Sequence, residues 1–211
     1  MRINLNGSIL TALTRTFDAI VVTVLFLLCC LPVFTMGAAC SAMYAAMIAL
    51  AGDSCTSVVR CFFGAFRDNF KQGTLLLIPV ALVGAVVAVD IAVCWGFEME
   101  ATLLLAIMQG LTVFCTCLYT AMSIYLFAGI AVYRVTWKQA LANGLFWCFR
   151  KLPATAGLVL LSTAMVVSVV ILWFFAFPVM VLCLYWQAKL LQKVFELEAP
   201  KKHHEEEIDY S

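Results

Sequence analysis

The stretch Ala19–Gly52 decides the fold: it reads AIVVTVLFLLCCLPVFTMGAACSAMYAAMIALAG and contains no Asp, Glu, Lys or Arg. A helix that crosses a bilayer needs about 20 apolar residues, so this run is too long for a single span. Pro32 lies inside the run, and proline ends or kinks a helix because it has no amide hydrogen to donate. We therefore expect two membrane-spanning helices here, one over 17–35 and one over 37–51.

The composition of the whole chain is that of an integral membrane protein. Of its 211 residues, 65% are hydrophobic and 12% are charged, and the formal net charge is +1. A soluble domain carries about 25% charged residues, so this chain has too little charge to cover a globule in water. The composition excludes a soluble enzyme and a disordered chain, and the small net charge excludes a basic nucleic-acid binder. The predicted fold is all-α and its partner is the lipid bilayer.

Three further apolar runs extend the pattern: Gln72–Trp95, Ala101–Tyr133 and Leu152–Ala188. The last is again too long for one span, and Pro178 divides it. The further spans are predicted at 73–96, 101–125, 154–173 and 175–191. With the first pair they make about six spans in a single membrane domain, residues 1–199. If Ala19–Gly52 is one bent helix, five spans remain.

The positions of the charges set the predicted topology. Lys and Arg accumulate in the cytoplasmic loops of membrane proteins, and here they cluster within 60–71, 134–151 and 189–202. The segment 96–100 carries only acidic charges. We therefore expect that segment outside the cell, both termini in the cytoplasm, and residues 200–211 as a charged cytoplasmic tail.

Two segments 83 residues apart are similar to each other. Phe62–Arg67 reads FFGAFR and Leu145–Arg150 reads LFWCFR, and each precedes a leucine-rich run. We interpret 17–96 and 101–191 as duplicated halves of parallel topology, an architecture that transporters use.

Each copy lies within a basic amphipathic segment, Val58–Lys71 or Trp137–Lys151. The predicted apolar face of the second segment consists of Trp137, Leu141, Leu145, Cys148 and Phe149. Such a helix between two spans lies naturally in the membrane interface, and docking to a cytoplasmic partner is the alternative. The docking residues would be Phe66, Arg67, Phe149 and Arg150.

The residues around Pro32 form a motif. Leu31–Tyr44 reads LPVFTMGAACSAMY, a P-x-x-T-x-G-A turn before an Ala-rich helix, and Phe62–Gln72 reads FFGAFRDNFKQ. Both resemble the YesL-like bacterial integral membrane family, domain of unknown function 624. The resemblance implies a multi-pass protein of the bacterial cytoplasmic membrane, encoded beside carbohydrate ABC importers and glycoside-degrading enzymes. It transfers no catalytic residue.

The same motif has a physical interpretation as a structural turn. Pro32 frees backbone groups, Thr35 can form hydrogen bonds with them, and Gly37 permits a tight turn. The small residues that follow, Ala38 to Ala46, predict close helix packing. The alternative is that the unwound backbone of the turn lines a ligand site, as broken helices do in transporters.

Asp90 and Gln109 are the candidate substrate or ion residues. Asp90 is the only acid within the apolar runs, and a charge inside a membrane often marks an ion or substrate path. Its position near the outer end of a span is the competing explanation, because water reaches it there. For Gln109 the alternative is an interhelical hydrogen bond.

The sequence contains no catalytic, metal-binding or cofactor motif. An intramembrane aspartyl protease needs two acids, and a zinc protease needs His-Glu-x-x-His on a helix, whereas His203 and His204 lie in the charged tail. We therefore expect a non-enzyme without cofactor or metal. The first hypothesis is an accessory component of carbohydrate uptake that contacts the permease or ATPase subunits of an ABC importer. A small autonomous transporter or channel, and a membrane scaffold or sensor, are the alternatives.

Overall fold

The computed structural model describes residues 5–52, 54, 57–96, 103–133, 137–171 and 176–198, and the regular structure in these ranges is entirely helical, which confirms the all-α prediction. The elements are α1 (Leu5–Cys29), the 3-10 turn η1 (Val33–Thr35), α2 (Met36–Ala51), α3 (Val58–Gly96), α4 (Leu103–Tyr133), α5 (Trp137–Arg150), α6 (Leu152–Ile171) and α7 (Ala176–Glu198). The predicted acidic segment and charged tail lie mainly or wholly outside the described residues.

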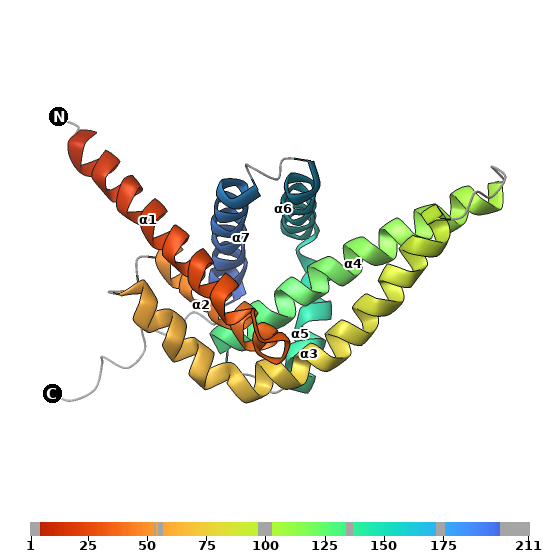
Figure 1. Ribbon diagram of the computed structural model, residues 1–211, viewed down its shortest axis with the longest axis horizontal. Coiled ribbons are helices and arrows are strands. Elements are labelled where there is room, and N and C mark those ends of the chain that lie inside the picture. The colour runs from red at the N-terminus through yellow and green to blue at the C-terminus, as the bar shows by residue number, and fades with distance from the viewer. Residues whose placement is uncertain are drawn as a thin grey trace, which may run out of the picture.

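The break predicted within Ala19–Gly52 is present. Helix α1 ends at Cys29, η1 follows Pro32, and α2 begins at Met36. Figure 1 shows α1 and α2 side by side as a helical hairpin, and the two helices are in contact. Proline therefore separates the run into two helices.

Helix α2 is the centre of the fold. It is apolar and small-sided around its whole circumference, and it contacts α1, α3, α4 and α7. Ala38, Ala42 and Met47 have no more than trace exposure. A helix that is apolar on every side is stable only when it is buried on every side, so the Ala-rich sequence explains its central position.

Helix α3 corrects the prediction of a separate interfacial helix over 58–71. This segment and the predicted span over 73–96 form one continuous helix of 39 residues, about 58 Å long at 1.5 Å per residue. No proline lies between Val58 and Ile78 to end it. Its first half packs against α2, and Phe62 is fully buried there.

In the second half of the chain, the basic segment and the span that follows it form two helices instead of one. Helices α5 and α6 meet at Lys151 and are bent by 102°. Pro153 is the second residue of α6, a position where proline is compatible with a helix start but not with continuation of the preceding helix. The corresponding residue of the first half, 83 positions earlier, is Phe70. The duplication therefore remains a prediction, because the halves differ in this connection.

Among the residues that the structure describes, three elements are long and apolar enough to cross a membrane: Val33–Ala51, Val58–Gly96 and Leu103–Tyr133. The bent pair of α5 and α6 makes a fourth if it is counted as one span. Helices of this length and hydropathy are compatible with a multi-pass membrane protein. The count of six spans and the orientation of the termini remain predictions.

The far halves of α3 and α4 form an arm that projects from the body, about 80–96 and 103–119 (Figure 1). Large apolar side chains are exposed along both of its helices, for example Leu82, Val86, Leu104 and Ile107. Exposed apolar surface of this extent requires lipid or protein to cover it.

Candidate functional site

In the turn between α1 and α2, a single side chain donates to two backbone carbonyl oxygens. The hydroxyl of Thr35 lies 2.5 Å from the carbonyl oxygen of Cys29 and 2.6 Å from that of Pro32, so its one hydrogen is shared between them. Carbonyls at a helix end lack helical amide donors, and Thr35 is itself buried. The geometry is that of a packed hairpin turn.

Gly37 lies where α2 crosses α3. A side-chain carbon added to it would overlap the backbone carbonyl of Gly73, and one added to Gly73 would lie 2.9 Å from the Cα of Ala38. The absence of side chains lets the two backbones touch. The sequence does not predict that Gly73 takes part in this contact. The signal that would have pointed to it is a glycine near the start of the apolar run Gln72–Trp95.

Gln109 makes an interhelical hydrogen bond in the arm. Its Nε2 donates to the carbonyl oxygen of Cys94 on α3 at 3.3 Å. One turn further along α4, the hydroxyl of Thr112 lies 3.4 Å from the Cys94 sulfur. Asp90 is on the same arm but is exposed, and the Gln109 bond goes to Cys94. The arrangement joins two helices, which is the alternative interpretation of Gln109.

Nearer the body, Tyr119 joins the same two helices. Its hydroxyl donates to the carbonyl oxygen of Val80 at 3.0 Å. The tyrosine lies against Gly84, where any side chain would overlap its hydroxyl. The arm is thus joined by polar contacts at both its outer and inner parts.

Gln187 has the larger of the buried amide side chains in the described part of the chain, and it is not among the predicted site residues. Its exposed fraction is 2%. Its Oε1 accepts a hydrogen bond from the Tyr44 hydroxyl at 3.3 Å, and its Nε2 donates to the Ser162 hydroxyl at 3.0 Å. Three helices, α2, α6 and α7, meet at this amide. The signal in the sequence is a glutamine within the apolar run Leu152–Ala188.

Helix α5 is anchored by Trp147, which lies outside the predicted apolar face. The ring lies 5.1 to 6.2 Å from those of Tyr125, Tyr133 and Phe195, and it is buried. Leu145, Phe146 and Phe149, near the same end of α5, are exposed instead. The predicted face is therefore wrong at Leu145 and Phe149, whereas Cys148 is buried as predicted. The difference arises because Trp147 packs against rings on α4 and α7.

The four predicted docking residues lie on two helices, two on α3 and two at the end of α5. Phe66 is half-buried on α3 between Phe62 and Phe70 in an aromatic row, and Arg67 beside it is exposed. Phe149 is 58% exposed at the end of α5. The Arg150 guanidinium, also exposed, lies 5.2 Å from the centre of the Phe146 ring.

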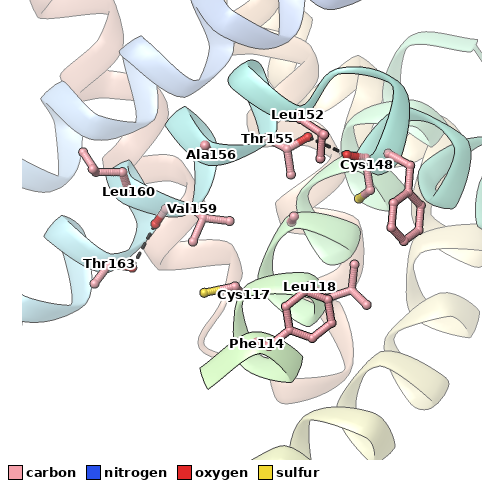
Figure 2. A pocket seen from close by; sticks show the side chains of 12 residues that line it. Phe114, Cys117, Leu118, Cys148, Leu152, Thr155, Ala156, Val159, Leu160 and Thr163 are labelled. Atoms are coloured by element: carbon pink, nitrogen blue, oxygen red, sulfur yellow. Dashed lines mark hydrogen bonds between the residues drawn. The ribbon is translucent and has the colours of Figure 1, made fainter. Parts of the chain in front are cut away.

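A groove of about 520 Å³ separates α4 from the start of α6, as Figure 2 shows. It is lined by Phe114, Cys117, Leu118, Ala121, Cys148, Phe149, Leu152, Thr155, Ala156, Val159, Leu160 and Thr163. The hydroxyl of Thr163 donates to Val159 at 2.9 Å, and that of Thr155 donates to the backbone oxygens of Cys148 and Lys151. Because both hydroxyls bond to backbone, the wall is apolar.

Eight of the cysteines are free in the described part of the chain, whereas Cys61 is disulfide-bonded.

Comparison with known proteins agrees with the motif. Residues 19–91 match the family model described as a protein of unknown function, DUF624. No curated protein matches the chain, and no solved structure matches it. The matched segment contains the Pro32 turn, α2 and most of α3. It confirms the resemblance predicted from the sequence: residues 19–91 of this chain match DUF624, a family of unknown function.

Proposed function

We propose that this chain is a non-enzymatic accessory component of carbohydrate uptake, bound in the membrane to the permease or ATPase subunits of an ABC importer. One observation carries the proposal: the strongly polar side chains of its apolar helices bond to the protein itself. Gln109, Tyr119 and Gln187 each join two or more helices. A sugar pathway needs several polar groups that converge on an open cavity.

The groove between α4 and α6 does not supply such a pathway. Its two threonine hydroxyls already bond to backbone carbonyls, and that of Thr155 also lies 3.2 Å from the Tyr125 hydroxyl. The remaining wall is hydrocarbon or thiol. This supports an accessory role over a sugar transporter that acts alone.

The surface for a protein partner is the set of exposed arginines with neighbouring aromatic rings. Arg67 on α3 and Arg150 at the end of α5 are both exposed, and Phe149 is next to the second. A guanidinium binds a carboxylate through two parallel hydrogen bonds, and exposed aromatic and arginine side chains are common at protein interfaces. The link to carbohydrate importers in particular rests on the family resemblance.

The proposal is tested by sugar uptake in a bacterium that encodes this chain beside a carbohydrate importer. Deleting the gene for the chain, with the importer genes intact, is expected to lower uptake of the labelled sugar, and restoring the chain is expected to recover it. Liposomes that contain only the purified chain are expected to take up none. Uptake into these liposomes would support the autonomous transporter, and unchanged uptake after deletion would support the scaffold or sensor.

A further inference from the structure

The groove between α4 and α6 has the chemistry of a hydrocarbon site. Its volume of about 520 Å³ lies within the range of small-molecule sites, about 300–1,000 Å³. The two hydroxyls on its wall already donate to backbone oxygens. A bound molecule would therefore make apolar contacts along the groove, and its polar groups would find few hydrogen-bond partners.

Part of the groove wall is made of exposed apolar side chains. Phe114 is 60% exposed and Leu160 is 70% exposed, and both line it. Beyond the groove, Val170 of the same helix is 77% exposed. In a membrane, large apolar side chains with this exposure are covered by acyl chains unless a protein covers them.

The length of the groove matches one leaflet. Its wall on α6 runs from Leu152 to Thr163, which is about 16 Å at 1.5 Å per residue. Half of a hydrocarbon core is about 15 Å. One extended acyl chain therefore has the length of this wall.

Two basic residues lie next to one end of the groove in the chain. Phe149 and Leu152 line it at the corner between α5 and α6, and Arg150 and Lys151 stand between them in the chain. The Arg150 guanidinium rests near the Phe146 ring, and its five hydrogen-bond donors suit phosphate oxygens. Clusters of Lys and Arg at a membrane surface attract anionic headgroups.

We propose that the α4–α6 groove holds one acyl chain of an anionic phospholipid, with the lipid phosphate bound by Arg150 and Lys151 at the α5–α6 corner. The inference requires no importer, although Arg150 is also a proposed docking residue. Arg150→Lys separates the two roles, because Lys keeps the charge that a lipid phosphate needs but not a two-bond contact to a carboxylate. The site is one for a resident lipid rather than for general solvation, since it pairs a hollow of leaflet length with two cations.

The test uses the full chain in nanodiscs of phosphatidylcholine with a minority of phosphatidylglycerol. After exchange into detergent, retained phospholipids are counted per chain by native mass spectrometry. The wild-type chain is expected to retain one phosphatidylglycerol. Ala156→Trp, which fills the groove, is expected to lose it, whereas Val170→Trp on the exposed face of the same helix keeps it.

A second pair of variants tests the headgroup. Arg150→Gln combined with Lys151→Gln is expected to lower the preference for phosphatidylglycerol over phosphatidylcholine by about tenfold, while Arg150→Lys keeps most of it. Equal retention in Ala156→Trp and in wild type would overturn the groove assignment. A wild-type chain that shows no preference between the two lipids would overturn the headgroup assignment.

A photoreactive side chain at Leu118 separates lipid from protein occupants in intact cells. A lipid adduct supports the proposal, and a polypeptide adduct contradicts it. Gel filtration of every variant establishes that it is folded. If Ala156→Trp aggregates, the milder Ala156→Leu is tested for loss of lipid in its place.

Discussion

Gly37 of α2 and Gly73 of α3 lie backbone against backbone, so close that a side-chain carbon on either would meet main-chain atoms of the opposite helix. The contact joins the Pro32 turn to the longest helix of the chain. Between transmembrane helices there is little hydrophobic driving force, so association depends on packing and on small residues at the crossing. This crossing therefore fixes the position of α3 against the buried α2.

Gly37→Ala and Gly73→Ala are each expected to lower the amount of folded protein in the membrane severalfold. Each added methyl has to displace backbone rather than a flexible side chain, and overpacking of this kind costs about 1–3 kcal/mol. Gly64→Ala is the matched control on α3, because a carbon there meets nothing within 4 Å. Quantitative immunoblotting of membranes checks the result, and normal abundance of Gly37→Ala would contradict the close crossing.

The bond between Tyr44 and Gln187 is expected to show coupling in a double-mutant cycle. Tyr44→Phe and Gln187→Met should each lower thermal stability in detergent, and their combined effect should be smaller than the sum because they share one hydrogen bond. Interhelical bonds of this kind contribute about 0.6 kcal/mol on average. Tyr119→Phe combined with Gln187→Met serves as the control pair and should be additive. Additivity of the first pair would argue against the bond.

The closed arm is tested by a disulfide across it. Because the Thr112 hydroxyl lies 3.4 Å from the Cys94 sulfur, Thr112→Cys is expected to form a cross-link with Cys94 after mild oxidation. A protease site engineered between α3 and α4 makes the link visible as fragments that stay together on a non-reducing gel. Thr116→Cys, one turn away with its hydroxyl bonded to Thr112, should cross-link far less.

A bulky residue at Gly84 is expected to open this arm. Gly84→Val places its side chain where the Tyr119 hydroxyl lies, so the cross-link between Cys94 and Thr112→Cys should form more slowly. Gly110→Val is the control on α4, because a carbon there meets nothing within 4 Å. Equal cross-linking in both variants would show that Tyr119 does not hold the arm closed.

The predicted orientation is tested with reporter fusions. Fusions after Lys71, Lys151 and Lys202 should report the cytoplasm, because each of these residues belongs to a cluster of basic residues. A fusion after Met99 should report the outside, because the segment around it is acidic. A fusion after Lys202 that reports the outside would remove one of the six predicted spans.

Local rules in the sequence predict the separate helices well, because they depend on neighbouring residues. Pro32 predicts the break before α2, and small residues predict its tight packing. The continuous α3 is harder to predict, since a basic amphipathic segment and a span share the same helical backbone with no breaker between them. Gln187 and Trp147 are missed for a different reason: their burial depends on partners from distant helices.

Binding of the chain to an importer is tested most directly by affinity purification of the full chain from gently solubilised membranes. The account predicts that a permease or ATPase subunit of the neighbouring carbohydrate importer is recovered with the wild-type chain. It also predicts that Arg67→Lys with Arg150→Lys lowers this recovery at equal abundance, because Lys cannot replace a two-bond guanidinium contact to a carboxylate. Recovery of no importer subunit with the wild-type chain, or full recovery with the double variant, would contradict the docking account.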